Sequence, residues 1–277
     1  MQVVSLALGF CRQRLDEIDD LRLRQVILWT TAVYLADESP RLALYIQDRL
    51  VRLAHSSRDP VAAIEALRLR ADLFGRVGRL EDAKLDLQAA RSLVDRLDPD
   101  PVQSGLLGSI LLAEGKIRSA DRNARLKCLE QALAVIQKTD YRLKLLETYL
   151  EYARAYRSLG DFDQAEAYLM KGLEELEHQR KLVGPEQRTP FWDGAQDLFR
   201  EMVDLQIDVH HRADLAFEYA ERARSRELLD RIGQGFRQPV TLKKLMRELP
   251  QGITMVSFAI LERQILVWAI RREGWEI

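Results

Sequence analysis

Few residues of this sequence have the type and spacing needed for catalysis or metal binding. The two cysteines, Cys11 and Cys128, lie far apart and match no metal-ligand spacing. A nucleophilic thiol at Cys128, within KCLEQAL, would need a nearby histidine to activate it, so we interpret Cys128 as a half-buried helix residue. Two cysteines also rule out a disulfide framework, which favours a reduced, cytoplasmic chain.

The histidine and glycine pairs do not form a recognisable site either. His210 and His211 are adjacent, whereas a zinc pair on a helix needs a spacing of three or four, so we expect both to lie in a turn. Gly233 and Gly235 lack the preceding strand and following helix of a dinucleotide site, and no phosphate-binding loop occurs. We therefore predict a non-enzymatic chain with no catalytic residue, cofactor or metal site.

Composition indicates what kind of fold must hold the remaining polar residues. Hydrophobic residues make up 47% of the 277 residues and charged residues 31%, with 14 Gly and 8 Pro, which is typical of a folded protein rich in amphipathic helices. The formal net charge of -1 argues against recruitment of nucleic acid or an anionic membrane. The apolar segment from Val3 to Cys11 is about half the ~20 residues that span a bilayer, so we expect a buried opening helix.

An internal repeat is the main signal in the sequence. Eight positions between Leu67 and Ala90 keep their character as large apolar, small or glycine when 82 is added to their numbers. The pairs are Leu67/Tyr149, Ala71/Ala153, Phe74/Tyr156, Gly78/Gly160, Leu80/Phe162, Ala83/Ala165, Leu87/Leu169 and Ala90/Gly172. Because half of 82 is 41, one unit should lie between these two copies.

Weaker copies of the unit lie before, between and after the two best ones. The matching residues are Tyr34 and Ala43 in the earliest copy, Gly108, Leu111, Gly115, Leu129 and Ala132 in the middle, and Ala216, Ala220 and Ala223 in the last. Helix starts are marked by Ser39-Pro40, Asp59-Pro60 and Asp100-Pro101, each a capping residue followed by proline. The sequence thus predicts about five helical hairpins, with Gly78 and Gly160 at turns that need positive φ.

The turn sequence of the best copies resembles that of the tetratricopeptide (TPR) family. The pattern G-x-[LF]-x-x-A occurs from Gly78 and from Gly160, with an aromatic residue four positions before each glycine, and the likeness extends over roughly residues 20 to 232. It implies an all-α, right-handed helical solenoid over residues 1–235. Arrays of this family bind protein or peptide partners, which we therefore expect here. The units are nearer forty residues than the usual thirty-four.

The resemblance also implies a peptide groove on the first helix of each hairpin. Its candidate residues are Glu65, Arg68, Asp72, Arg76, Glu147, Arg154 and Arg157. Arginines at such positions can hold the carboxylates of a peptide in bidentate fashion. A solvated face with ion pairs within each helix explains the same residues equally well. Asparagine-based grip of a terminal carboxylate is not expected, because Asn123 is the only asparagine and lies outside the groove positions.

The pattern changes after residue 235. A linker at 236–240 precedes a short helix capped by Thr241 and two apolar strands, Thr254–Leu261 and Ile265–Ile270, with a third strand beginning at Trp275. Both faces of the strands are apolar, as in a sheet covered on both sides. This order is similar to the junction between TPR arrays and the CHAT domain, a caspase-like module, which implies that 241–277 begin an incomplete α/β domain. The catalytic His and Cys of that family have no counterpart here.

Two functions fit these features. In the first, the array is the recognition or regulatory arm of a CHAT-type peptidase-like protein; in the second, it is a free-standing adaptor that forms homodimers through the hairpin. The hairpin should fold back near Leu228 and Ile232 or pair with a second copy, and we favour pairing because one helical face cannot cover both sides. The candidate self-association residues are Val256, Phe258, Ile260, Val267 and Trp268.

Overall fold

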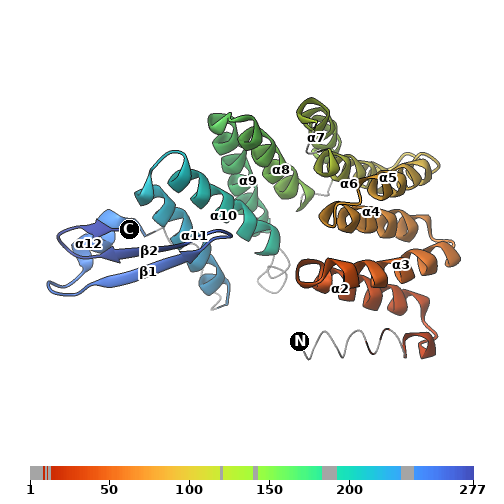
Figure 1. Cartoon of the computed structure of the whole chain (residues 1–277), viewed down its shortest axis with the longest axis horizontal. Helices are drawn as coiled ribbons and strands as arrows, with labels where there is room; N and C mark the ends of the chain where they lie inside the picture. Colours follow the sequence, from red (N-terminus) through yellow and green to blue (C-terminus); the bar gives the residue numbers. More distant parts are fainter. Residues whose placement is uncertain are drawn as a thin grey trace. The chain divides into compact units, whose positions relative to one another are not determined.

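The computed structural model describes most of the chain. It covers residues 9, 11, 14–118, 121–139, 143–182, 192–231 and 240–277. These form two units, Met1–Lys144 and Leu145–Ile277, which are described one at a time (Figure 1). Three predicted features lie outside the described residues: most of the opening helix, most of the linker at 236–240, and Ile232. The side chain of Leu228 is also not described.

The first unit consists of helical hairpins stacked side by side. Its elements are η1 (Leu15–Glu17), α2 (Leu21–Glu38), α3 (Pro40–Ser56), α4 (Pro60–Arg76), α5 (Leu80–Val94), α6 (Pro101–Ile117) and α7 (Arg122–Ile136). Helices consecutive in sequence pack against each other, and α4 also contacts α6. Each helix therefore buries its apolar stripe against its neighbours, as in other repeat proteins.

The second unit continues the hairpins and ends in a sheet. It contains α8 (Leu143–Leu159), α9 (Phe162–Leu182), α10 (Trp192–Asp208), α11 (Ala213–Arg231), α12 (Leu242–Glu248), β1 (Met255–Ile260), β2 (Ile265–Ile270) and β3 (Trp275–Glu276). The described residues thus form five long hairpins and one small antiparallel sheet of order β1-β2-β3. The predicted fold class, a helical repeat array followed by a short β element, is confirmed.

Local sequence signals explain where the helices begin. Pro60 and Pro101 occupy the first turns of α4 and α6, and the preceding aspartates cap them: Asp59 accepts from the Ala62 N–H at 3.1 Å and Asp100 from the Gln103 N–H. Thr241 caps α12 in the same way. Ser39 departs from the prediction, because its side chain makes no capping hydrogen bond at the start of α3.

The 82-residue repeat is present in the packing. Ala71 and its counterpart Ala153 are at most 2% exposed, and the turn glycines Gly78 and Gly160 have φ of 78° and 77°, which a residue with a side chain adopts at a cost. The earliest copy differs, since Tyr34 is 56% exposed. The buried stripe of α2 instead runs through Leu28, Ala32 and Leu35.

The sheet follows the predicted strands but is covered on one face only. β1 pairs antiparallel with β2 from Met255↔Ile270 to Ile260↔Ile265, so side chains alternate between two faces. Leu266, Trp268 and Ile270 are buried, whereas Val256 and Phe258 are 61% and 56% exposed. Helices thus cover a single face of the sheet, and the second apolar face that the sequence predicted is exposed among the described residues.

That covered face packs on the last two helices. Trp268 lies edge-on to Phe217 of α11, with ring centroids 5.6 Å apart, and its indole N–H donates to the Ala213 carbonyl at 3.2 Å. Leu242 of α12 belongs to the same apolar cluster. Trp268 is completely buried, so it is not available for the self-association in which the sequence placed it. The hairpin has folded back on helices through one face.

Candidate functional site

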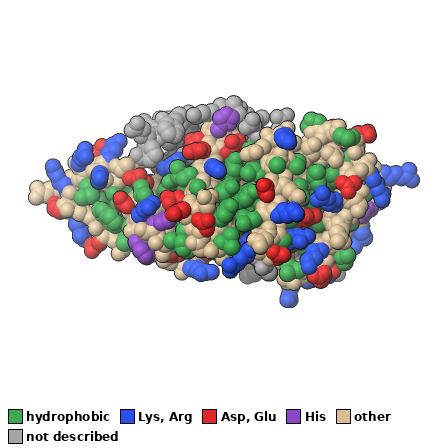
Figure 2. All heavy atoms as spheres, turned by 90° about the horizontal axis from the view of Figure 1, so that it is seen from above, with side chains coloured by type: hydrophobic (Ala, Val, Ile, Leu, Met, Phe, Trp, Pro, Cys, Tyr) green, Lys and Arg blue, Asp and Glu red, His purple; other side chains and the backbone are tan. Residues whose placement is uncertain are grey.

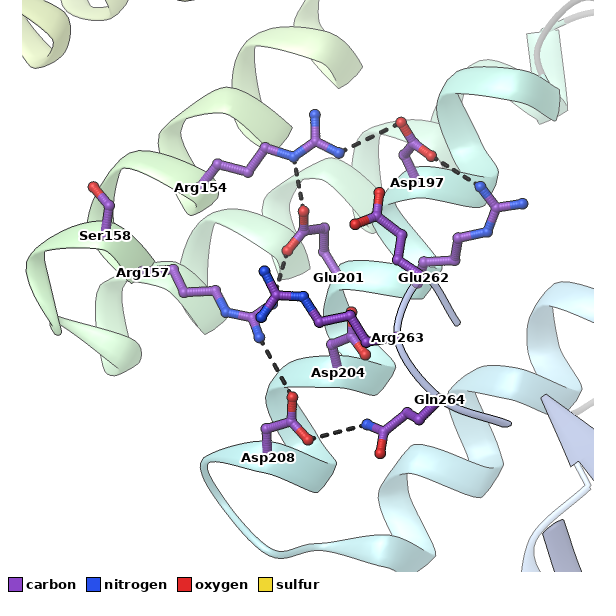
Figure 3. Close-up of a pocket in the computed structure, with 11 residues that line it drawn as sticks. Arg154, Arg157, Ser158, Asp197, Glu201, Asp204, Asp208, Glu262, Arg263 and Gln264 are labelled. Atoms are coloured by element: carbon purple, nitrogen blue, oxygen red, sulfur yellow. Dashed lines mark hydrogen bonds and ion pairs between the residues drawn. The ribbon is translucent and has the colours of Figure 1, made fainter. Parts of the chain in front are cut away.

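A polar cavity of about 340 Å³ in the second unit is the most developed candidate site (Figure 3). It lies between α8, α10 and the turn that joins β1 to β2. Its lining residues are Arg154, Arg157, Ser158, Asp197, Arg200, Glu201, Asp204, Asp208, Glu262, Arg263 and Gln264. Five carboxylates and four guanidinium groups therefore meet around one cavity, which we call the charged cavity.

Helix α10 supplies most of the negative charge. Asp197, Glu201, Asp204 and Asp208 follow one another at spacings of four, three and four residues. With 3.6 residues per turn, this spacing places all four carboxylates along one face of the helix, as Figure 3 shows. The opposite face of α10 carries apolar residues such as Leu198 and Met202, which are buried in the core of the second unit. The apolar stripe thus fixes the direction in which the carboxylates point.

Helix α8 provides two arginines that grip one of these carboxylates. Glu201 accepts a hydrogen bond from Arg154 Nε at 2.7 Å through one oxygen and from Arg157 Nη1 at 3.0 Å through the other. Arg154 also contacts Glu151 on its own helix at 3.1 Å and Asp197 of α10 at 3.5 Å. Charge-assisted bonds of this kind hold planar guanidinium groups in a defined orientation.

The surroundings of Arg154 keep it firmly protonated. Burial alone would lower its pKa, but the hydrogen bond to Glu201 and the charges of Glu151 and Glu201 outweigh that effect and raise the pKa. The guanidinium is therefore a permanent cation that is already neutralised by carboxylates of the chain itself. A carboxylate from a peptide would have to displace them, which argues against the bidentate peptide contact expected from the sequence at this position.

The β1–β2 turn closes the cavity on a third side. Gln264 Nε2 donates to Asp208 Oδ1 at 3.1 Å, and Arg157 Nη2 lies 3.7 Å from the other oxygen of Asp208. Asp208 therefore joins the end of α10 to both α8 and the turn. In the sequence, the residues of this turn only separate two predicted strands, and no local pattern indicates their contribution to the cavity.

Two carboxylates of the charged cavity remain without a partner. Among the described residues, neither Asp204 nor Glu262 makes a hydrogen bond or an ion pair. Of the lining guanidinium groups, that of Arg263 also has no partner among these residues. Burial raises the pKa of Asp204, and the neighbouring charges of Asp208, Glu201 and Glu262 act in the same direction against Arg157. The cavity thus retains uncompensated negative charge.

The groove residues expected in the first unit have a different arrangement. Arg68 has a side chain only 8% exposed and pairs within α4, with Glu65 at 2.8 Å and Asp72 at 3.1 Å. Arg76 pairs with Asp37 of α2. These four predicted residues thus engage the chain's own charges, as the alternative interpretation of ion pairs within the helix expected for the first three.

Only part of the predicted second-unit set lines the charged cavity. Arg154 and Arg157 do, whereas Glu147 lies on α8 about two turns before Arg154 and is not part of the lining. The carboxylates of α10 and the residues of the β1–β2 turn were not predicted. The spacing of acidic residues in QDLFREMVDLQID was a usable signal for the first group, because it marks one polar helix face.

The cysteine and the histidines considered for nucleophilic or metal chemistry lie in a buried helix position and in a turn. Cys128 is 8% exposed, and burial together with Glu114 raises the pKa of its thiol. His210 and His211 lie in the turn between α10 and α11, as predicted. The described part of the chain contains no group of three or more His, Cys, Asp or Glu residues arranged to hold a metal ion. It also contains no helix both long and apolar enough to cross a membrane.

Charge on the molecular surface is mixed. On the face shown in Figure 2, Lys and Arg side chains alternate with Asp and Glu side chains and with hydrophobic ones. This agrees with the formal net charge of -1 for the whole sequence. Recognition by charge must therefore depend on local groups such as those of the charged cavity.

Comparison with known proteins identifies the repeat. The sequence profile of the tetratricopeptide repeat family matches residues 106–177, so the chain contains a TPR. No curated protein matches the sequence. Among solved structures, BtubC (BKLC) from P. vanneervenii is similar with a TM-score of 0.52 and 18% identity, over 86% of this chain and 93% of that one. That similarity shows a shared fold.

A second solved structure is that of a Podosopora anserina protein described as a putative kinesin light chain with nearly identical TPR-like repeats. It has 16% identity, a TM-score of 0.46, and coverage of 77% of this chain and 96% of that one.

Proposed function

We propose that this chain is a non-enzymatic scaffold that binds a protein partner in the cytoplasm. The observation that carries the proposal is the series of helical hairpins, part of which matches the tetratricopeptide repeat. TPR proteins are generally interaction scaffolds, because stacking buries the apolar stripes and leaves the charged faces available to other proteins. The near-zero net charge favours a protein partner over nucleic acid or a membrane surface.

Affinity capture tests the scaffold proposal. The tagged whole chain is incubated with extract of its source cells, and retained proteins are quantified by mass spectrometry with and without a tenfold excess of untagged chain. We expect at least one protein to be retained and to be competed away by the untagged chain, because a specific surface saturates. If every retained protein resists competition, the scaffold proposal is contradicted.

We further propose that the array serves as the recognition or regulatory arm of a CHAT-type peptidase-like protein. The support is the sequence resemblance of the segment from α11 to β3 to the junction between TPR arrays and CHAT domains. The open apolar face of the sheet agrees with it, since a further layer of structure would normally cover such a face. Sequencing the gene beyond the codon for Ile277 tests this idea, which requires further strands and a His–Cys pair.

An adaptor that dimerises through its sheet is the second candidate. The specific observation is that Val256, Phe258, Ile260 and Val267 lie on one exposed face, each 47–65% exposed. Exposed apolar patches of this kind recruit other surfaces. Light scattering should then show a dimer for the whole chain and a monomer for Val256→Lys/Val267→Lys. A monomeric unmodified chain would eliminate this candidate.

A further inference from the structure

A second cavity, of about 380 Å³, lies beside the charged cavity in the second unit. It is lined by Gln196, Phe199, Arg200 and Val203 of α10, Ala220, Ala223 and Arg224 of α11, and the run from Phe258 to Leu261. Most of these side chains are apolar. Because the lining includes β1 but no residue of β2 or β3, this apolar groove runs along the outer edge of the sheet.

The backbone of β1 is partly open toward the groove. The turn is closed by a hydrogen bond from the Leu261 N–H to the Gln264 carbonyl at 2.9 Å, and antiparallel pairing then alternates along the strand. The backbone N–H and C=O of Ala259 therefore point toward β2. Those of Phe258 and Ile260 point away from β2, toward the groove. The outward carbonyl of Phe258 accepts a hydrogen bond from Arg224, which agrees with this alternation. In the described part of the chain nothing bonds to the N–H and C=O of Ile260, so these groups can pair with another strand.

The apolar groove and the charged cavity adjoin each other. Both are lined by Arg200, and the groove ends at Leu261 where the lining of the charged cavity begins at Glu262. An extended segment in the groove would therefore reach Glu262 and Asp204, the carboxylates that have no partner among the described residues. A positively charged side chain there would compensate charge that Arg157 does not neutralise, since Arg157 is committed to Glu201 and Asp208.

We propose that this surface binds an extended segment of the partner protein that carries an apolar anchor residue followed closely by a lysine or arginine. The segment pairs with the outer edge of β1 at Ile260, its apolar side chain fills the groove, and its basic side chain enters the charged cavity between Asp204 and Glu262. Strand addition supplies affinity through the backbone, and the two cavities supply specificity. This inference rests on the proposed scaffold function and names the chemistry of the partner.

Charge complementarity favours this occupant over an acidic one. Arg154, Arg157 and Arg200 are already paired with carboxylates of α10, so an acidic segment would compete with groups of the chain itself. A basic side chain could bind Asp204 and Glu262 without breaking an existing ion pair among the described residues. Arg263 is the one lining guanidinium without a partner among the described residues, and its single positive charge is set against the two carboxylates of Asp204 and Glu262. Arg263 and Glu262 are both exposed in the turn, so solvent screens their charges alike.

A peptide array provides the test. The probes are nine-residue peptides with a Thr/Val background, one Leu, and Arg, Lys, Gln or Glu two positions before or after the Leu. The whole chain is applied to the array, and the best probes are measured by fluorescence anisotropy up to 1 mM. We expect the Arg and Lys probes to bind at least tenfold more tightly than the matching Glu probes.

Two variants and two matched controls locate the binding. Ile260→Lys places a cation at the groove wall and should weaken the Arg probes at least tenfold. Its cross-strand neighbour Ile265 is equally exposed, at 64% against 65%, but does not line the groove, so Ile265→Lys should have little effect. Asp204→Asn/Glu262→Gln should abolish the preference for basic probes, whereas Glu273→Gln in the β2–β3 turn should not.

Several results would overturn the inference. One is that no probe binds at 1 mM, or that the Glu probes bind as tightly as the Arg and Lys probes or more tightly. Another is that Ile260→Lys and Ile265→Lys weaken the binding of the Arg probes equally. A third is that the chain forms a dimer that Ile260→Lys dissociates, because the groove would then be occupied by a second copy. The scaffold function is tested separately. If Ile260→Lys still captures the competable partner from extract, the scaffold stands and only this surface is wrong.

Discussion

Helices α4 and α8 occupy the same place in the repeat, 82 residues apart, but they use their charged side chains differently. In α4, Arg68 pairs with two acids of its own helix, Glu65 and Asp72. In α8, Arg154 and Arg157 reach across to Glu201 of α10. Arg68 is thus neutralised within its own helix, whereas Arg154 and Arg157 form a cavity wall with a neighbouring helix.

The difference shows which positions of the repeat are constrained. Ala71 and Ala153 are both buried, since a larger residue would separate the packed helices. The polar positions have no such restriction, so Asp72 in α4 corresponds to Arg154 in α8 at the 82-residue offset. A repeat can thus keep its packing while this polar position holds an acid that pairs within its helix in one copy and an arginine that lines a cavity in the other.

The largest effects should come from the packing positions that the two copies share. Leu87 and Leu169 correspond to each other and are 1% and 2% exposed. We expect Leu87→Ala and Leu169→Ala each to reduce the free energy of unfolding by about 2–5 kcal/mol, because each leaves a cavity in a core. Urea denaturation followed by circular dichroism measures the loss, and hydrogen exchange locates it in α5 or α9. A loss in the free energy of unfolding below ~1 kcal/mol for either variant would show that the two positions are not equivalent in packing.

A smaller effect should separate the two charged arrangements. Glu201→Ala removes the acceptor shared by Arg154 and Arg157, and we expect a loss of about 1–3 kcal/mol in the free energy of unfolding. Asp72→Ala leaves Arg68 its bond to Glu65, so its loss should stay below about 1 kcal/mol. Urea denaturation of both variants, with Glu201→Gln as an isosteric control, checks this order. The reverse order would show that the network between helices adds no more than a pair within one helix.

A weaker, pH-dependent effect should come from Asp204. Because its folded-state pKa is raised above the ordinary 3.8, the free energy of unfolding falls as the pH rises through 3.8, and the loss is complete above the folded-state pKa. Below the ordinary pKa the group is protonated in both states and the cost vanishes. Asp204→Asn should therefore stabilise the chain by up to about 1 kcal/mol at pH 7 and by nothing near pH 3. Thermal melts at both pH values measure this gain. If the stabilisation by Asp204→Asn instead increased as the pH fell, the pKa of Asp204 would be lowered in the folded chain and not raised.

No effect is expected from Cys128→Ser on activity or partner capture. The thiol is buried, its pKa is raised, and it belongs to the first unit. The whole chain should cleave neither a mixed fluorogenic peptide library nor ATP. Cleavage by the unmodified chain that disappears in Cys128→Ser would show a catalytic thiol and refute the scaffold proposal.

The sequence alone determined the repeat, several helix starts and the limits of two strands. The 82-residue offset, the Asp-Pro helix starts and the positive φ of Gly78 and Gly160 were all predicted, and both strands lie within one residue of their predicted limits. These features depend on interactions within a few residues: a capping hydrogen bond, the restriction of proline, or the freedom of glycine. The alternation of apolar and polar residues with helical period is equally local.

Tertiary structure decided which faces are covered and which charges meet. Both faces of the β1–β2 strands are apolar in sequence, and only the packing of α11 and α12 decides that Trp268 is buried and Phe258 is exposed. Likewise, Arg154 and Glu201 are 47 residues apart and Asp208 and Gln264 are 56 apart. Charged side chains have many possible partners of similar energy, so the choice among them follows from how the apolar cores orient the helices.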